Sequence, residues 1–466
     1  MQKKPNILFI LSDDHGVWAN GCYGNHEIIT PNIDNLAERG TRFENFFCVS
    51  PVCSPARASI LTGRIPSQHG IHDYLCDGNG YENQESIEFL EGQRGYTDFL
   101  NEHGYQCALS GKWHMGDSFR PQKGFSFWYC HQKGGGPYYG APMVRDGKAV
   151  TEERYITDVI TDEALRFLDI RDKSRPFYLS VHYTAPHSPW IDNHPEEYVK
   201  LYEDCAFETC PQGEPHPWAL TDIMPGYTNP RENLKGYFAA VTAMDYNIGR
   251  LIKRLEDEGI LEDTLIIFTG DNGMNCGHHG IWGKGNGTFP MNMYDYSVKV
   301  PFIISHPGVL PEGKVCDELF SAYDIMPTLL DYLGIENPEA DKLPGRSFLP
   351  LLKGETMDEK PVMVFDEYGP VRMIRTKEYK YIHRYVYGPN EFYDLKTDPN
   401  EDNNLIDHPE YQDIIGEMKR KMDTWFNKYV DPEIDGAREP VMGGGQKNLA
   451  GLRGPMYDVY RENKYV

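Results

Sequence analysis

Short hydrophobic runs recur along the first 300 residues of the chain, and a polar segment follows each of them. The first run is 6–11, and similar runs lie at 176–183 and 264–269. Apolar runs of this length without polar alternation are typical of strands buried on both faces of a parallel sheet. Helical spacing of apolar residues predicts helices over 155–168 and ahead of Gly259. The alternation predicts a doubly wound, mostly parallel α/β sheet flanked by helices.

The same patterns define further elements of this sheet. A short helix is expected to open near Pro31 and to close at Gly40, and a second helix is expected over 96–103. Strands are expected over 105–109 and 300–305. These elements complete a large first unit.

The pattern changes at about Pro361. Short alternating segments are followed by a helix over 411–429, which predicts a smaller α+β unit built on an antiparallel sheet. A chain of 466 residues exceeds the usual single-domain size, so we expect two domains, 1–360 and 361–466. The short segments are 362–365, 371–376, 379–387 and 391–393.

Three long stretches fit no regular element: 134–147, 191–231 and the Gly-rich tail 435–466. Long loops of this kind are usually functional or mobile, so the first two are expected to form pocket walls. The tail could have no fixed position, cover the active site or reach a neighbouring subunit. Aromatic side chains that could face a substrate, or simply pack in the core, are Trp128, Tyr138, Tyr139, Trp190 and Trp218.

Paired polar residues follow two of the buried strands. Asp13 and Asp14 come directly after the first strand, and Asp271 and Asn272 follow the strand at 264–269. Open α/β sheets bind ligands at the carboxyl ends of their strands, and hard oxygen donors suit Ca²⁺ or Mg²⁺. A helix cap or a turn is the plain alternative for either pair alone.

The segment 50–64 contains the pattern C-x-P-x-R, formed by Cys53, Pro55 and Arg57, followed by Leu-Thr-Gly. Pro51 and Pro55 are expected to keep the flanks of Cys53 out of regular helix, while a helix can begin at Ala58. The thiol would then lie at a positively polarised helix start, with Arg57 pointing back towards it. Most free cysteines are simply small buried side chains, which is the alternative here.

This pattern resembles the signature of the type I sulfatases of the alkaline phosphatase-like superfamily, in which the cysteine is oxidised to Cα-formylglycine (3-oxoalanine) by a separate maturation enzyme. The resemblance extends over most of the first unit, including 30–36 and 321–328, and to the phrase at 392–395. It implies an enzyme that hydrolyses a small aryl, steroid or sugar sulfate monoester to an alcohol and sulfate. One hydroxyl of the aldehyde hydrate would attack sulfur, and the other would expel sulfate.

The resemblance also implies roles for individual residues. Four side chains and modified Cys53 would bind a divalent ion, usually Ca²⁺, although Mg²⁺ is possible; the four are Asp13, Asp14, Asp271 and Asn272. The basic residues would surround the hydrate and the sulfate: Arg57, Lys112, His114, His187 and Lys284. Lys112 and His114, two positions apart, would project to one side of an extended segment. His182 is expected to pack in the core, and His279 is a weaker candidate for substrate contact.

Charge and hydropathy limit the partners. The net charge of −24 repels nucleic acids and long polyanions, which favours a small anionic ester met by local cations. The mean hydropathy of −0.57 gives no sign of membrane residence. The first apolar run is too short for a signal peptide, so a cytoplasmic location is expected. Ten cysteines without a C-x-x-C pair fit reduced thiols.

Two other functions stay open from the residues alone. Phosphonate monoester and phosphodiester hydrolases of the same superfamily also use C-x-P-x-R, but they tend to carry Asp-His where this chain has Asp271-Asn272, and they lack the Lys-x-His pair. A non-catalytic anion-binding protein with unmodified Cys53 is the second alternative. The sulfate ester, the choice of Ca²⁺ or Mg²⁺ and the formation of a homo-oligomer also stay open.

Overall fold

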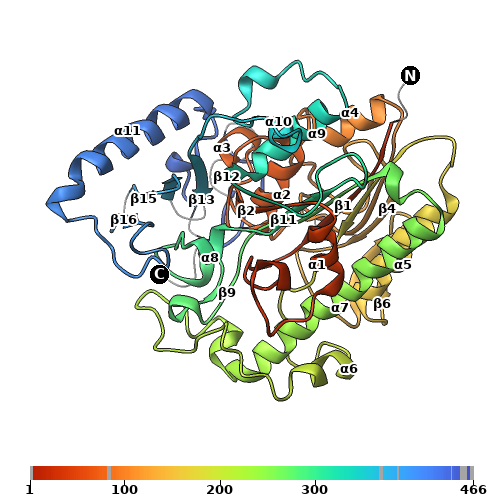
Figure 1. Ribbon diagram of the computed structural model, residues 1–466, viewed down its shortest axis with the longest axis horizontal. Coiled ribbons are helices and arrows are strands. Elements are labelled where there is room, and N and C mark those ends of the chain that lie inside the picture. The colour runs from red at the N-terminus through yellow and green to blue at the C-terminus, as the bar shows by residue number, and fades with distance from the viewer. Residues whose placement is uncertain are drawn as a thin grey trace.

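A sheet of ten strands crosses the middle of the computed structural model, and a separate sheet of four strands lies towards one end (Figure 1). The structure describes residues 4–80, 85–366, 371–385, 388–441, 443–451 and 459–461. The order of the large sheet is β12-β2-β11-β8-β1-β7-β3-β4-β5-β6.

Strand β1 (Asn6–Ser12) lies at the centre of the large sheet, between β7 (Phe177–His182) and β8 (Thr264–Gly270), and is parallel to both. Ile7, Phe9 and Leu11 join the core on one face of the sheet, whereas Leu8 and Ile10 join the core on the other. The strand therefore carries an unbroken apolar run because both of its faces are buried.

The parallel arrangement continues from β7 through β3 (Gln106–Lys112) to β4 (Phe125–His131). The expected, mostly parallel sheet is therefore confirmed at its centre. Antiparallel strands lie further out: β11 (Phe302–Ser305) between β8 and β2 (Thr41–Phe47), and the hairpin β5 (Ala141–Arg145) and β6 (Lys148–Glu152) at one edge. The opposite edge is β12 (Lys314–Ser321), which is parallel to β2.

Helices cover both faces of the large sheet. On one face, α1 (Pro31–Glu38), α5 (Ile156–Ile170) and α7 (Pro230–Asp257) bury their apolar sides. On the other face lie α2 (Cys53–Thr62), α4 (Tyr96–Glu102) and α9 (Ile325–Tyr332). The shorter helices are α3 (Pro66–His69), α6 (Glu196–Val199), α8 (Asp295–Val298) and α10 (Leu349–Leu352).

The second sheet is the predicted antiparallel one. It is a meander of β13 (Val362–Asp366), β14 (Val371–Arg375), β15 (Tyr379–Arg384) and β16 (Glu391–Asp394). Helix α11 (Gln412–Tyr429) packs on it through Met418, Met422 and Phe426. The apolar residues of this sheet belong to the same buried cluster as one face of the large sheet. A domain boundary at 360 stays a prediction.

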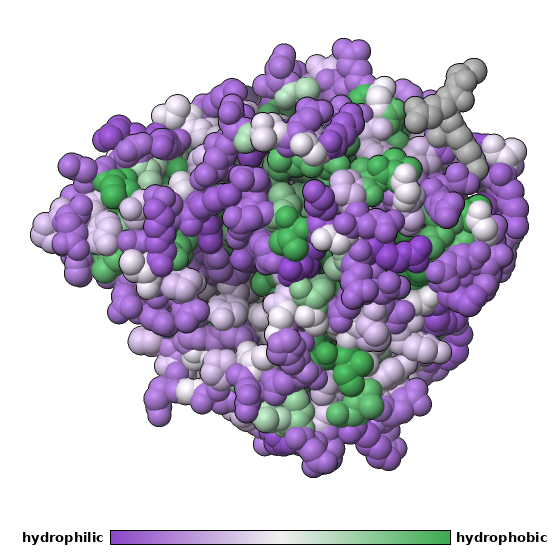
Figure 2. Space-filling view, viewed as in Figure 1, coloured by the Kyte–Doolittle hydropathy of each residue, from purple (hydrophilic) through white to green (hydrophobic). Residues whose placement is uncertain are grey.

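The outer surface in Figure 2 is mostly hydrophilic, with small separate hydrophobic patches, as expected for a chain with mean hydropathy −0.57. Within the described part of the chain, each helix is either too short or too polar to serve as a membrane span.

Candidate active site

The carboxyl ends of β1 and β8 bring the two acidic pairs together. Ser12 lies opposite Gly270 in the sheet register, so the residues that follow each strand are neighbours. Carboxylate oxygens of Asp13, Asp14 and Asp271 lie within 4.8 Å of one another, and all three residues are buried. Asp14 has a φ of 58°, which turns the chain so that its backbone N–H donates to Asp271 Oδ1 at 3.2 Å.

Asn272 completes this group. Its side-chain Nδ2 donates to Asp14 Oδ1 at 2.8 Å. Its Oδ1 is buried and has no hydrogen-bond partner among the described residues. Three buried carboxylates and an unpartnered amide oxygen are the donor set that a hard divalent cation prefers.

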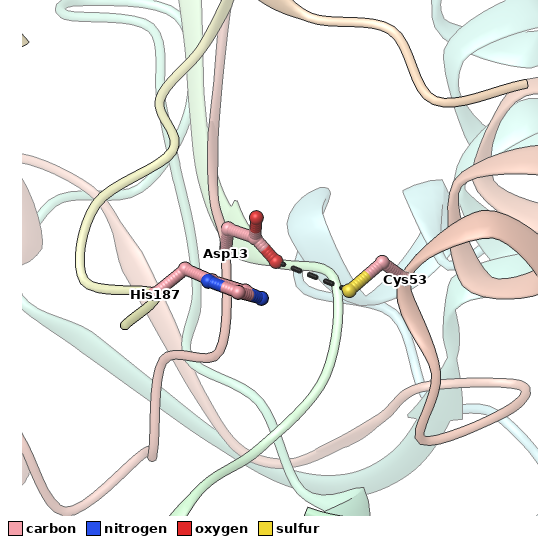
Figure 3. Close-up of side chains that lie close together, drawn as sticks. All are labelled: Asp13, Cys53 and His187. Carbon is pink, nitrogen blue, oxygen red and sulfur yellow. Dashed lines mark hydrogen bonds between the residues drawn. The ribbon is translucent and has the colours of Figure 1, made fainter. Parts of the chain in front are cut away.

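Cys53 lies at a helix start, as the sequence predicts, but α2 begins at Cys53 itself and not at Ala58, so the expectation about its flanks is wrong on one side. Pro55 lies inside the helix, in its first turn. The first N–H groups of a helix have no partner within it, so a proline there removes no hydrogen bond. The thiol Sγ lies 3.3 Å from Asp13 Oδ1 and 2.9 Å from Lys284 Nζ. Figure 3 shows the thiol and the imidazole of His187 on either side of Asp13.

Three buried cations balance the three carboxylates. The ammonium of Lys112 pairs with Asp13, and that of Lys284 pairs with Asp14. Arg57 donates from Nε to Asp271 Oδ2 at 2.9 Å and to the carbonyl oxygen of Lys112 at 3.1 Å. A divalent cation would add two positive charges to this balanced group, which suits a site for an anionic ester.

His187 lies on the segment after β7, with Nε2 3.6 Å from Asp14 Oδ2. The hydroxyl of Tyr138, a residue from the segment between β4 and β5, donates to the His187 carbonyl at 2.8 Å. His187 therefore lies beside the cluster of carboxylates, although it is distant from these residues in the sequence.

His114 does not lie on an extended segment, so the proposed reason for its orientation is wrong. Strand β3 ends at Lys112, and His114 has a φ of 56°, in the left-handed region. Lys112, the last residue of β3, pairs with Asp13, whereas the ring of His114 borders the cavity. His114 Nε2 lies 3.0 Å from the carbonyl oxygen of Leu75.

The charges of the cluster shift several pKa values. Burial alone would raise the pKa of Asp13, but Lys112, His187, Arg57 and Lys284 hold it well below its usual value. Burial, followed by the charge of Asp13, raises the pKa of Asp271 to about 7. Burial is also the main cause that raises the pKa of the Cys53 thiol to about 12 and that lowers the pKa of His114.

A cavity of about 430 Å³ opens beside this cluster, with Cys53, Asp14 and Lys284 in its wall. His114 and His187 also border it. Of the aromatic residues that the sequence suggested, Trp190 lines the cavity, whereas Trp128 and Tyr138 are buried in the core clusters and Tyr139 is exposed. Trp218 lies under the guanidinium of Arg384, 5.0 Å from it.

The sequence reading missed several residues of the cavity wall, notably Tyr74, Lys133, Trp282 and Asn286. Tyr74 and Lys133 come from connecting segments, Trp282 begins the two-residue strand β10 (Trp282–Gly283), and Asn286 lies in a single 3-10 turn. No strand or helix pattern in the sequence marks these positions. Gly134 and Gly135, in a stretch that the sequence left unassigned, also line the cavity, so its predicted role as a pocket wall is confirmed there. The same holds for 224–226 in the second unassigned stretch.

The other histidines lie elsewhere. His182 packs in the core as expected, with Nε2 2.6 Å from Ser180 Oγ. His279 stacks on Tyr294 at a centroid distance of 4.0 Å and is not among the residues that line the described cavity.

Comparison with known proteins agrees with this geometry. The family model described as Sulfatase matches residues 5–335, and a model described as N-sulphoglucosamine sulphohydrolase, C-terminal, matches 277–428. An N-acetylglucosamine-6-O-sulfatase of Bacteroides thetaiotaomicron is 31% identical over 96% of this chain and 90% of that protein. An arylsulfatase of Clostridium perfringens is 30% identical over 96% of this chain and 98% of that protein.

A solved structure, described as a complex with its substrate D-glucosamine-2-N,6-O-disulfate, superposes with a TM-score of 0.81. It is 27% identical and covers 94% of this chain and 100% of its own. The fold is that of the alkaline phosphatase-like superfamily, and the chain belongs to the sulfatase family, whose members hydrolyse sulfate esters.

Proposed function

We propose that this sulfatase removes sulfate from a small sulfated sugar, with an amino sugar sulfated on O6 as its preferred class of substrate. The observation that carries the proposal is the cavity itself. A charged end at Cys53 opens into a space bordered by Trp190, Trp282 and the amides of Asn79 and Asn286. Aromatic faces beside a few polar groups suit a compact polar ring better than a purely apolar steroid. The named substrates of two of the relatives, both glucosamine derivatives, support the same class.

The nucleophile would arise from Cys53. Oxidation to formylglycine would supply a hydrated aldehyde, one hydroxyl of which attacks sulfur while the other expels sulfate as the aldehyde re-forms. The position of Cys53 at the start of α2, inside C-x-P-x-R, supports this assignment. The helix start and the ammonium of Lys284 place positive charge where a negative oxygen would develop.

A divalent ion, Ca²⁺ or Mg²⁺, would be held by Asp13, Asp14, Asp271 and the free Oδ1 of Asn272. When bound, the ion would lower the pKa of the attacking hydroxyl and stabilise negative charge on the sulfate oxygens. Arg57 would hold the Asp271 carboxylate in place through its 2.9 Å hydrogen bond. The other two cations, Lys112 and Lys284, would be available to sulfate oxygens.

Two histidines would move protons. His187 borders the cavity next to Asp14 and would donate a proton to the departing sugar oxygen, together with Lys284. His114 is a neutral base because burial lowers its pKa, and it would accept the proton of the second hydroxyl. These roles place the acid and the base on different segments around Cys53.

Mass and turnover together test the proposal. Oxidation of the Cys53 thiol to the aldehyde lowers the intact mass by about 18 Da, and Cys53→Ala should abolish both this difference and activity. Matured enzyme should cleave glucosamine 6-sulfate and N-acetylglucosamine 6-sulfate faster than an aryl sulfate, a steroid sulfate or an aryl phosphodiester. A preference for the phosphodiester would indicate the phosphonate hydrolase alternative. Retention of an unmodified thiol together with tight sulfate binding would indicate the non-catalytic alternative.

A further inference from the structure

The C-terminal tail packs against one wall of the cavity, the segment 72–76. Gln446 forms a short parallel β-bridge with the segment 72–76, because its N–H donates to the Tyr74 carbonyl at 2.8 Å and its carbonyl accepts from the Cys76 N–H at 3.0 Å. Tyr74, Leu75 and Cys76 line the cavity beside Cys53. A residue about 370 positions away in sequence therefore holds one wall of the site.

The side chain of Gln446 is fully buried and completely hydrogen-bonded. Its Oε1 accepts from the backbone N–H groups of His72 at 2.8 Å and Asp73 at 3.4 Å. Its Nε2 donates to the carbonyls of Gly70 and Asn448, both at 2.9 Å. A primary amide offers two donors and one acceptor oxygen, and all of them are used here.

The glycine that precedes Gln446 explains the close approach of the tail. Gly445 has a φ of 102°, and a Cβ there would lie 2.9 Å from Cys76 Sγ and 3.0 Å from the ring of Tyr74. Its N–H donates to Asp73 Oδ2 at 2.9 Å. Glycine at this position therefore lets the tail backbone pack closely against Tyr74 and Cys76 in the cavity wall.

A contact with this wall determines which ring nitrogen of His114 carries the proton. The carbonyl oxygen of Leu75 lies 3.0 Å from His114 Nε2 and can only accept, so in the neutral ring Nε2 carries the proton. Nδ1 is then a bare lone pair. It is buried and has no hydrogen-bond partner among the described residues, and the ring borders the cavity.

We propose that Gln446 is a positioning residue for sulfate ester hydrolysis: it holds the segment 72–76 so that the Leu75 carbonyl keeps His114 protonated on Nε2 and basic on Nδ1. This inference rests on the proposed role of His114 as the proton acceptor. Without the amide of Gln446, three hydrogen bonds between the tail and the segment 70–73 are lost, together with one bond to Asn448 within the tail. The segment 72–76 then keeps its two backbone hydrogen bonds to residue 446, and the Leu75 carbonyl keeps the 3.3 Å bond from Asn79 Nδ2, but the wall is held less firmly. A shift of the Leu75 carbonyl lets the His114 ring rotate or change tautomer.

Kinetics of Gln446→Ala and Gln446→Met test the proposal, the second variant preserving side-chain volume without the amide. We expect kcat to fall roughly 10- to 100-fold, because small displacements of a proton-transfer group have effects of that size. KM should stay within about twofold, because the groups that hold sulfate are unchanged. Gln412→Ala is the matched control: Gln412 is exposed on α11 and its amide also donates to backbone carbonyls, at 2.7 and 3.2 Å, so this variant should keep full activity.

A double-mutant cycle separates positioning from general stability. In a His114→Ala background, Gln446→Met should cause no further loss of kcat, because the residue acts through the histidine. Additive losses would overturn the proposal.

The ¹⁵N shifts of the His114 ring give a readout that needs no turnover. We expect the Nε2–H tautomer in the wild-type protein and a mixture, or the Nδ1–H tautomer, in Gln446→Met. An unchanged ring signal in both variants would refute the positioning role even if the enzyme is active. Conversely, absence of sulfate ester cleavage by the matured wild-type enzyme would refute the proposed function and leave the tautomer result to be judged separately.

Discussion

Three consecutive glycines, 134–136, lie directly against the histidine rings around the site. A Cβ on Gly134 would lie 2.0 Å from His114 Cε1, and one on Gly135 would lie 3.2 Å from His187 Cε1. One on Gly136 would lie 3.0 Å from His131 Nε2. The absence of side chains lets this segment cover the histidines closely, which is the reason for glycine at these positions.

Gly134→Ala should therefore reduce activity more than stability. The added methyl group must displace the His114 ring or the loop itself, so we expect kcat/KM for a sulfate ester to fall at least about tenfold. Gly213→Ala provides the control, because nothing lies within 4 Å of its added Cβ. Steady-state kinetics of the two variants make the comparison, and equal activities would show that the loop does not constrain His114.

His194 links pH to stability. The ring is buried, with Nδ1 2.9 Å from the hydroxyl of Tyr155, and burial lowers its pKa from 6.5 to about 3. Above pH 6.5 the ring is neutral in both the folded and the unfolded state. Below that pH the unfolded chain binds a proton that the folded protein excludes, so stability falls as the pH drops from 6.5 towards 3.

The His194→Gln variant should weaken this dependence. Its free energy of unfolding should fall less steeply between pH 6.5 and 4.5 than that of the wild type, by up to about 1.4 kcal/mol per pH unit. Denaturant titrations at several pH values measure the slope. Identical slopes would mean that His194 is protonated in the folded state.

At the scale of elements, the ends of β1 and β8 carry the proposed metal ligands. Removal of the ion with a chelator should abolish activity and lower the melting temperature by several degrees, because ligands that bind the folded state stabilise it by mass action. Added Ca²⁺ or Mg²⁺ should restore both, and the better of the two identifies the ion.

Asp14→Asn provides the control for the ion effect, because it removes one of the carboxylates that lie within 4.8 Å of one another. This variant should need a higher concentration of the ion for the same increase in melting temperature. If a chelator changed neither melting temperature nor activity of the matured enzyme, the acidic cluster would be purely structural.

Element predictions succeeded where one local pattern sufficed. Buried runs identified β1, β7 and β8, and helical spacing identified α5 and α7. They missed β2, β4 and the hairpin β5–β6, and they gave no direction for β11, because pairing between strands depends on residues far apart in sequence. Pro55 within α2 shows a second reason: its effect depends on which turn of the helix it occupies.

The whole molecule carries a net charge of −24. Long sulfated polymers are repelled by that field, whereas a small ester inside the cavity responds mainly to the local cations. We expect kcat/KM for a sulfated oligosaccharide to rise with added salt, as screening shortens the field to about 8 Å at physiological ionic strength. The kcat/KM for a monosaccharide sulfate should change little with salt. A decrease of kcat/KM for the oligosaccharide on adding salt would contradict this prediction.

A cytoplasmic location and a homo-oligomer stay predictions.

The sequence by itself determined the chemistry: C-x-P-x-R at Cys53, the acidic pairs after two buried strands and the basic residues in short motifs are all local patterns. The tertiary structure decided how they meet. The register of β1 and β8 brings Asp13 and Asp271 together, a left-handed turn directs His114, and the tail supports the wall beside it through Gln446. These arrangements could not be read from the chain because each depends on contacts between segments tens to hundreds of residues apart, and local patterns carry no information about such contacts.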